Sequence, residues 1–364
     1  MLDQIFAVTL RPTPRPCRLG ARRPEHGLVN LLEWAIGTPP KVCAIQEKAS
    51  RQLGDCLTAT GVRRRFIVMI KPALLLALLC SGAVSAQDLP PVLAEGAEVK
   101  LLGDGFKFTE GPASDDAGNV YFTDQPNDRI HLWSIEGKLS TFKEPAGRSN
   151  GLFFDPEGKL IACADGKNEL WRIDVADGKV EVMLKDYDGK RLNGPNDVWV
   201  RPDGGLYFTD PFYKRPYWSH TETEQPGQYV YFLAKGSSTP VIVAQDLQQP
   251  NGIVGTADGK TVYVADIKAK QTWRYAVQPD GTLTDKHLFC SMGSDGMTLD
   301  REGNLYLTGK GVTVFNKAGE KTGTIPVDEG WTANVCFGGK DFDTLFITAM
   351  DSLYAVKTKV KGVR

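Results

Sequence analysis

The sequence predicts an all-β fold, a six-bladed β-propeller with four strands per blade and a ring closed by an N-terminal strand. Three features predict this fold. The 364 residues include 38 glycines and 22 prolines, which suits short strands joined by tight turns. Aromatic residues come as pairs such as Tyr121-Phe122 inside short strand-like runs. A hairpin pattern also recurs along the chain at the period of a propeller blade.

Five hairpin repeats follow one another, each with a turn glycine eight residues after its first residue. They are EGPASDDAGNVYFTD from Glu110, NGLFFDPEGKLIACAD from Asn150, NDVWVRPDGGLYFTD from Asn196, NGIVGTADGKTVYVAD from Asn251 and DGMTLDREGNLYLTG from Asp295. A sixth repeat, NVCFGGKDFDTLFITAM from Asn334, has a different turn. The starts lie 40, 46, 55, 44 and 39 residues apart, which fits four short strands per blade.

Two more strand patterns follow each first hairpin, such as HLWSI and KLSTF after the first. The sixth repeat ends after three strands, at SLYAV, so a strand at residues 97–102 is expected to supply the fourth and close the ring. The extra length of the third repeat, residues 212–228, is predicted to be an inserted loop.

The charge of the chain argues against nucleic acid as a partner. Residues 87–364 contain 31 Lys and Arg against 39 Asp and Glu, so the predicted propeller domain is acidic. Its three cysteines, Cys163, Cys290 and Cys336, lie in separate strand-like runs. Their spacing predicts core residues, not a disulfide framework or a zinc site.

Residues 62–86 are predicted to be a secretory signal peptide that is cleaved after Ala86. The stretch MIKPALLLALLCSGAVSA, from Met69, has a lysine, an apolar run and small residues before Gln87. A buried apolar helix is the alternative. Upstream, the stretch PTPRPCRLGARRPEH shows no strand or helix periodicity, and a signal peptide normally opens a chain, so residues 1–61 are expected to be a disordered, over-extended gene start. We therefore expect a protein exported to the bacterial periplasm or secreted, without a stable membrane anchor.

The first residues of the repeats, here called the ring positions, predict a metal site. The first strand of each blade lines the axis of a propeller, so these residues should converge at one end of the ring. The ring positions are Glu110, Asn150, Asn196, Asn251, Asp295 and Asn334. All of them offer a carboxylate or amide oxygen, and such oxygens suit a hard divalent cation, Ca²⁺ above all.

The alternative for any single ring position is that its side chain only closes a turn. A second set of aspartates recurs after the second strand of the repeats, and its regularity predicts a structural turn residue instead of a site. The set is Asp124, Asp165, Asp210 and Asp266.

A cation held in this way polarises a carbonyl oxygen and lowers the pKa of water, and ester or lactone hydrolysis needs both effects together with a base. The four histidines, His26, His131, His220 and His287, all lie outside the ring positions. The base is therefore predicted to be a ring carboxylate, either Asp295 or Glu110.

The motifs FTEGP, LNGPNDVWVRPDGGLYFTDP, PNGI and SDGMTLD resemble those of the regucalcin and gluconolactonase family, six-bladed calcium-dependent lactonases. The resemblance covers residues 101–356. It implies that Glu110, Asn196, Asn251 and Asp295 hold the metal, that Asn196 also faces the substrate, and that Asp295 is the acid and base.

The resemblance also shows one departure. Regucalcin-like members have a substrate-binding arginine two residues before the equivalent of Asn196, where this chain has Gly194. Substrate recognition is therefore expected from other residues. The candidates are Arg148, Asn150, Asn193 and four residues of the insertion, Tyr213, Lys214, Tyr217 and Trp218. Arg148 could instead be simply solvated, and the aromatic residues could pack only within their own loop.

These observations predict a Ca²⁺-dependent hydrolase that opens a sugar lactone such as gluconolactone, with another divalent cation possible. The expected partner is a small lactone, and the protein is expected to be a monomer or a weak oligomer. Two alternatives stay open. One is a non-catalytic propeller that binds a sugar or a protein around a structural Ca²⁺; the other is hydrolysis of a phosphotriester.

Overall fold

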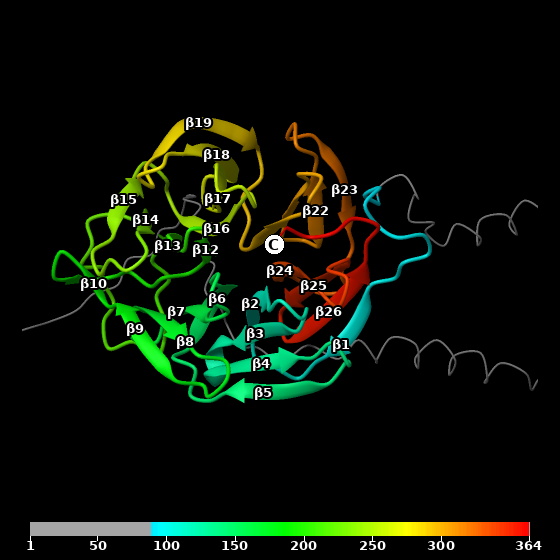
Figure 1. Ribbon diagram of the computed structural model, residues 1–364, viewed down its shortest axis with the longest axis horizontal. Coiled ribbons are helices and arrows are strands. Elements are labelled where there is room, and N and C mark those ends of the chain that lie inside the picture. Colours follow the sequence, from blue (N-terminus) through cyan, green and yellow to red (C-terminus); the bar gives the residue numbers. More distant parts are fainter. Residues whose placement is uncertain (1–88, 364) are drawn as a thin grey trace, which may run out of the picture. The chain divides into compact units, whose positions relative to one another are not determined.

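The computed structural model describes residues 89–363, which form a six-bladed β-propeller (Figure 1). Its six four-stranded antiparallel sheets are arranged in a ring around a central axis. The predicted fold class, blade number and strand number are confirmed. The predictions for residues 1–61 and 62–86, a disordered gene start and a signal peptide, concern residues outside those described.

The blades follow one another in chain order, and in the first five the first strand lies innermost. Blade 1 consists of β2 (Thr109–Ser114), β3 (Val120–Asp124), β4 (Arg129–Trp133) and β5 (Leu139–Lys143). Blade 2 consists of β6 (Ser149–Phe154), β7 (Leu160–Ala164), β8 (Glu169–Ile173) and β9 (Val180–Leu184). Blade 3 consists of β12 (Val198–Val200), β13 (Leu206–Asp210), β14 (Tyr229–Leu233) and β15 (Val241–Ala244).

The other three blades repeat this order, except that the last one borrows a strand. Blade 4 consists of β16 (Pro250–Gly255), β17 (Thr261–Asp266), β18 (Gln271–Val277) and β19 (Leu283–Cys290). Blade 5 consists of β20 (Met297–Leu299), β21 (Leu305–Leu307), β22 (Val312–Phe315) and β23 (Lys321–Ile325). Blade 6 consists of β24 (Thr332–Gly338), β25 (Thr344–Ala349), β26 (Ser352–Lys357) and β1 (Lys100–Gly103).

The ring closes as predicted, through the pairing of β1 with β26. The two strands are antiparallel, with Lys100 opposite Ala355. The strand begins at Lys100 and not at residue 97, because Ala97 donates its N–H to the carbonyl of Ala94 in a turn. Since β1 precedes all the other blades in the chain and β26 follows them, this pairing covers an edge strand and joins the two ends of the propeller.

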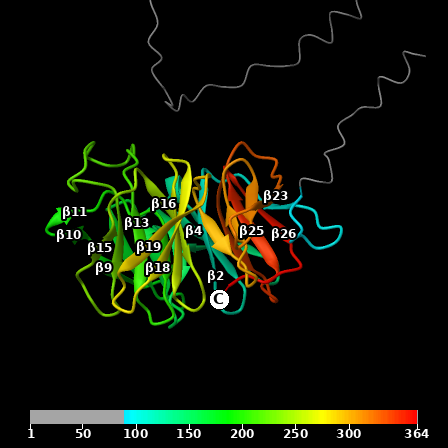
Figure 2. The same cartoon turned by 90° about the horizontal axis from the view of Figure 1, so that it is seen from above.

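The apolar core lies between neighbouring blades. Figure 2 shows the blades side by side, with their strands running between the two faces of the ring. One cluster joins Cys163 of blade 2 to Phe208 of blade 3, and others join Cys290 to Leu307 and Cys336 to Val120 across two further interfaces. The three cysteines are buried and free, so the core role predicted for them is confirmed.

Local features of the repeats also match the sequence. The turn glycines adopt a left-handed backbone, as at Gly118 (φ 92°) and Gly204 (φ 86°), which suits the hairpin turn. The insertion 212–228 contains no strand or helix, whereas a small hairpin of β10 (Asp186–Tyr187) and β11 (Lys190–Arg191) was not predicted. A short 3₁₀ helix, η2 (Gln125–Asn127), follows β3. Residues 89–363 contain no helix of the length and apolarity that a membrane crossing requires.

Candidate functional site

Glycines that follow the ring positions let the inner strands meet closely. A Cβ at Gly111 would lie 2.0 Å from the carbonyl oxygen of Asn150, and a Cβ at Gly252 would lie 2.7 Å from that of Asp295. Only glycine permits such an approach. Each of these glycines therefore brings its own ring position against the ring position of the next blade.

A threonine near the end of the second strand adds a hydrogen bond between blades. Thr123 Oγ1 donates to the carbonyl of Asn150 (3.1 Å), and Thr209 Oγ1 donates to that of Asn251 (2.7 Å). These four residues are buried. The bonds therefore hold the backbone from which the ring side chains project.

The structure corrects the sixth ring position from Asn334 to Ala333. The carbonyl of Ala333 accepts hydrogen bonds from the N–H of Gly296 (2.8 Å) and from Thr308 Oγ1 (2.9 Å), the contacts that other ring positions make. Oδ1 of Asn334 instead accepts the N–H of Val335 (2.8 Å). The sixth repeat lacks the shared turn glycine, so its asparagine was aligned one residue too late. Blade 6 contributes a methyl group to the ring, not an oxygen.

Glu110 and Asp295 form the charged part of the site. Nδ2 of Asn251 donates to Oδ1 of Asp295 (2.8 Å), and Nε1 of Trp331 donates to Oδ2 (2.8 Å). Oε2 of Glu110 accepts the N–H of Gly111 (3.1 Å). Burial, followed by the charge of Asp295, raises the pKa of Glu110 well above its usual value, and burial also raises the pKa of Asp295. A cation would relieve this repulsion between the buried Glu110 and the partly buried Asp295.

The donor atoms present fit a hard divalent cation. Nδ2 of Asn251 is engaged by Asp295 and Tyr213, while Oδ1 of Asn251 is buried without a hydrogen-bond partner among residues 89–363. An orphaned amide oxygen beside two carboxylates suits oxygen-preferring cations such as Ca²⁺. In the same part of the chain, no three His, Cys, Asp or Glu side chains gather closely enough to hold a metal ion. The candidate site therefore depends on amides as well as carboxylates.

The insertion reaches this site through Tyr213, whose hydroxyl accepts the hydrogen bond from Nδ2 of Asn251 (2.8 Å). Tyr213 is thus adjacent to the predicted metal-binding residues. Two other predicted residues, Asn150 and Asn196, are buried at ring positions, with 3% and 4% of their surface exposed.

Asn193 holds the insertion in place. Its Nδ2 donates to the carbonyls of Asp210 (3.0 Å) and Gly227 (2.8 Å), which lie just before the insertion and near its end. Asn193 is only 1% exposed. This geometry gives it a structural task that the prediction of substrate binding did not include.

Arg148 lies against the insertion. Its guanidinium carbon is 4.4 Å from the centre of the Tyr217 ring, and its Nη1 donates to the carbonyl of Pro126 (2.8 Å). Trp218 donates its Nε1 to the carbonyl of Asp165 (2.7 Å), whereas Lys214 is exposed. Arg148 and the aromatic residues of the insertion therefore belong to one cluster.

Asp165 departs from the turn role predicted for it. Asp210 accepts the N–H groups of Asn193 (2.9 Å) and Gly194 (2.8 Å), and Asp124 and Asp266 accept backbone N–H groups in the same way. Asp165 instead binds side chains. Its Oδ2 accepts from Nε of Arg215 (2.9 Å), from the Tyr217 hydroxyl and from Nε2 of Gln125 (3.0 Å).

In blade 2, Asp128 accepts the backbone N–H groups that the repeated aspartate accepts in other blades. The Asp165 carboxylate is therefore available for side chains. Oδ1 of Asp128 accepts the N–H groups of Ala146 (3.0 Å) and Arg148 (2.6 Å), which lead into β6. Arg215 and Trp331 were also missed by the sequence analysis. Neither occupies a repeated position, so no signal in one sequence placed them beside the ring.

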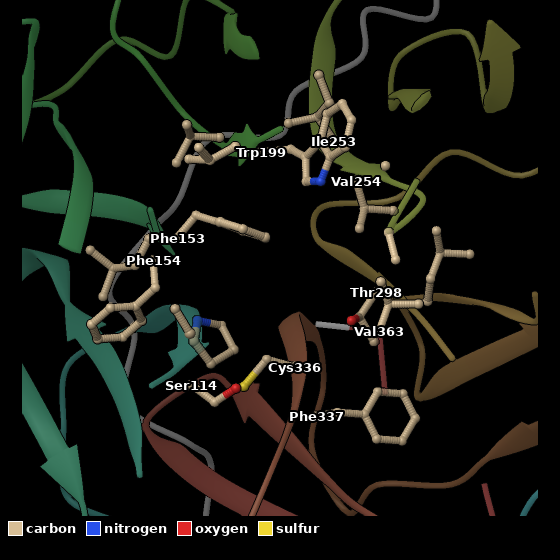
Figure 3. A pocket seen from close by; sticks show the side chains of 18 of the residues that line it. Ser114, Phe153, Phe154, Trp199, Ile253, Val254, Thr298, Cys336, Phe337 and Val363 are labelled. Atoms are coloured by element: carbon tan, nitrogen blue, oxygen red, sulfur yellow. The ribbon is translucent and has the colours of Figure 1, made fainter. Parts of the chain in front are cut away.

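A cavity of about 390 Å³ runs along the inner strands (Figure 3). Figure 3 shows Phe153, Trp199, Val254, Cys336 and Phe337 around it. Its lining is mostly apolar and includes none of the four predicted metal-binding residues. Asp197 and Asn334, which follow the ring positions of blades 3 and 6, contribute polar groups. The polar site and this apolar channel are therefore distinct parts of the axis.

Comparison with known proteins gives one consistent result. Residues 108–351 match the protein-family profile described as SMP-30/Gluconolactonase/LRE-like region. A gluconolactonase from Zymomonas mobilis is 27% identical over 303 residues, covering 75% of this chain and 85% of that relative. A solved gluconolactonase structure from Xanthomonas campestris is 30% identical, with a TM-score of 0.68, and covers 74% of this chain and 95% of that one. The structure of a calcium-binding regucalcin from Agrobacterium tumefaciens, 22% identical with a TM-score of 0.63 over 73% of this chain and 95% of that one, supports the fold alone.

Proposed function

Since the chain belongs to the SMP-30/gluconolactonase/LRE-like family, we propose that it is a divalent-cation-dependent hydrolase that opens a sugar lactone. The gluconolactonases among its relatives support lactone hydrolysis as the reaction class. The choice of a sugar lactone and of Ca²⁺ as the cation goes further and is our proposal.

One observation carries the proposal: the buried Glu110 and the partly buried Asp295 lie with an amide oxygen, Oδ1 of Asn251, that has no hydrogen-bond partner among residues 89–363. Glu110, Asn196, Asn251 and Asp295 would hold the cation. When bound, a divalent cation polarises a carbonyl oxygen and lowers the pKa of water. Two carboxylates also balance its charge.

The reaction assigns a separate task to Asp295. Water adds to the lactone carbonyl carbon, the ring C–O bond breaks, and the product is a hydroxy acid. Asp295 accepts a proton from the water and returns it to the leaving ring oxygen. The hydrogen bonds from Asn251 and Trp331 hold both oxygens of its carboxylate in place. Glu110 is the second carboxylate and the alternative base.

Substrate binding is assigned to the residues around the pair. Asn196 and Asn150 lie at ring positions, and Tyr213 reaches the same place from the insertion. The Tyr213 hydroxyl accepts from Asn251 and has its own proton to donate to a sugar oxygen. Arg148, the remaining candidate, contacts Tyr217 of the insertion.

A pH-stat assay tests the proposal. Lactones of different ring size and hydroxyl pattern should be hydrolysed by the untreated protein, not after chelation, and again after Ca²⁺ is added. If no lactone is turned over but chelation lowers the melting temperature, the ion is a structural plug and the non-catalytic alternative holds. Faster turnover of phosphotriesters in the same assay would favour that reaction instead.

We also propose that the protein is exported. The support is the sequence of residues 62–86, with its lysine, apolar run and small residues before Gln87. N-terminal sequencing of material from the periplasm or medium should start at Gln87. A mature N-terminus well before that residue would refute the signal peptide.

A further inference from the structure

Arg215, a residue of the insertion, forms an ion pair with Asp165. Its Nε donates to Oδ2 of Asp165 (2.9 Å), and its guanidinium carbon lies 5.3 Å from the centre of the Tyr213 ring. The Asp165 side chain is 2% exposed, whereas that of Arg215 is 22% exposed. The ion pair therefore has a buried anchor and a cation that remains accessible.

The accessible cation lies close to the carboxylate pair. The positive charge of Arg215 lowers the pKa of both Glu110 and Asp295, although burial outweighs this effect. The neighbouring Tyr213 shares a hydrogen bond with Asn251. Through Tyr213, Arg215 is thus linked to Asn251, the ring position that binds Asp295.

The absence of a side chain at Gly194 leaves space for this ion pair. A Cβ at Gly194 would lie 2.6 Å from Oδ1 of Asp165 and 3.0 Å from the Trp218 ring. Any side chain at this position, two residues before Asn196, would displace the anchor of Arg215. The position of the Arg215–Asp165 ion pair therefore requires glycine at residue 194.

Charge balance indicates what Arg215 is for. A divalent cation would neutralise Glu110 and Asp295, and Asp165 already neutralises Arg215. Arg215 is therefore not needed to balance the ring. Among residues 89–363 the Arg215 side chain makes one hydrogen bond, from Nε to Asp165, so both of its terminal NH₂ groups are left without a protein acceptor there. A planar guanidinium fork with free NH₂ groups matches paired acyl oxygens.

We propose that Arg215 binds the substrate through these NH₂ groups, which donate to the carbonyl oxygen of the lactone and to the carboxylate formed when the ring opens. Asp165 is then a positioning residue, which acts only through Arg215. This assignment rests on the proposed lactone hydrolysis. It gives the site a group that binds the acyl oxygens as they gain charge.

The test compares the wild type with Arg215→Lys, Arg215→Met and the double variant Asp165→Asn/Arg215→Met, all with Ca²⁺ present. Arg215→Met should lower kcat/KM for glucono-1,5-lactone about 10²- to 10³-fold, as expected for the loss of a donor to a developing oxyanion. Arg215→Lys keeps the charge without the fork and should recover part of the loss. It should also weaken binding of sodium gluconate, the ring-opened product, less than Arg215→Met does.

The double variant separates substrate binding from folding. Arg215→Met alone leaves the buried Asp165 unpaired, which is itself destabilising. The double variant removes that unpaired charge and should regain stability but not activity. Recovery of activity in the double variant would overturn the proposal.

Arg172→Met is the matched control. Its side chain is 26% exposed, and its Nε donates to Asp155 (2.7 Å), which is 9% exposed. This variant should keep kcat/KM and gluconate binding. Calcium titration of the metal-free proteins adds a second readout: loss of a nearby positive charge should leave Ca²⁺ affinity equal or higher in Arg215→Met, whereas a collapsed insertion would lower it.

The outcomes distinguish this proposal from the proposed function. A wild type that hydrolyses lactones alongside an equally active Arg215→Met variant refutes the role of Arg215 and leaves the function intact. A wild type that hydrolyses no lactone refutes the function, and gluconate titration still decides the role of Arg215. Equal gluconate affinity in the wild type and Arg215→Met, or no gluconate binding by the wild type, overturns the role of Arg215. Gluconate binding at least tenfold weaker in Arg215→Met supports that role.

Discussion

Asn251 donates a 2.8 Å hydrogen bond from Nδ2 to Oδ1 of Asp295, and this bond joins ring positions of two neighbouring blades. The same nitrogen donates to the hydroxyl of Tyr213, so the amide is held in place while its Oδ1 has no hydrogen-bond partner within residues 89–363. One asparagine thus orients the candidate base, contacts the insertion and presents an oxygen for a cation.

Asp295→Asn should abolish most hydrolysis and preserve the fold. An amide cannot accept the proton from water, and loss of a general base costs about 10²- to 10⁴-fold in rate. In chelated protein the same change should raise the melting temperature, because it removes a negative charge that opposes the ionisation of the buried Glu110. Lactone turnover and thermal melting, each with and without chelator, check both statements. Full turnover by the variant would show that Asp295 is not the base.

The stability of the metal-free protein should fall as pH rises from about 4 to about 7. Burial raises the pKa of Asp197 and of Asp210 from 3.8 to about 7, and it also raises the pKa values of Glu110 and Asp295. In this window the folded state keeps protons that the unfolded state has lost. The stabilisation is complete below the unfolded pKa and is lost as pH rises through the folded pKa.

Ca²⁺ should reverse this trend at the neutral end. At pH 7 a saturating cation should raise the melting temperature, since a ligand that binds only the folded state stabilises it by about 2.7 kcal/mol at 100 times its Kd. At pH 4 the rise should be smaller, because protons on Glu110 and Asp295 compete with the ion. Melting curves across pH, with calcium or chelator, measure both effects. A metal-free profile that rises from pH 4 to 7 would contradict the assignment of raised carboxyl pKa values.

The propeller could be predicted because its information is local and repeated. Each hairpin carries its own turn glycine and its own alternation, and five copies aligned at Gly118 and its equivalents without any reference to contacts. The sixth repeat lacks that glycine, and there the prediction was wrong by one residue, at Asn334 instead of Ala333. A register shift of one residue turns a side chain to the other face of a strand.

The parts of the site that were missed depend on contacts between distant segments. Asp165 and Arg215 are 50 residues apart, and Trp331 is 36 residues from Asp295. Asp165 occupies a repeated position, so its sequence context predicted the turn role that its equivalents have. Only the presence of Asp128 in the preceding loop, which binds the backbone N–H groups in its place, frees Asp165 to hold Arg215.

Thr209→Val should lower both the stability of the protein and its affinity for Ca²⁺. Thr209 is fully buried; its hydroxyl donates to the carbonyl of Asn251 (2.7 Å) and accepts the N–H of Asp197 (3.1 Å). Valine leaves both groups unpaired, which costs about 1–3 kcal/mol of unfolding free energy. Ca²⁺ affinity should fall as well, because Asn251 loses its support from blade 3. Denaturant unfolding and calcium titration measure these losses.

The control for that change is Thr282→Val, at an exposed threonine whose hydroxyl bonds to the nearby Asp280. It should change stability by less than about 0.5 kcal/mol. Equal effects at the two sites would mean that the hydrogen bond between blades contributes nothing.

Gly194→Ala should disable the site by displacing the insertion. The glycine has φ 145°, a conformation that L residues rarely adopt, and a methyl group there would lie 2.6 Å from Oδ1 of Asp165. Backbone strain of this kind costs about 1–3 kcal/mol. The clash adds a second effect, since Asp165 must move and take Arg215 with it.

Gly158→Ala is the matched control, because its φ of 72° brings similar strain with no atom within 4 Å of the new methyl group. Both variants should lose stability in thermal melting, but only Gly194→Ala should also lose lactone turnover and gluconate binding. If the two variants keep the same activity, the space above Gly194 is not what holds Arg215 at the site.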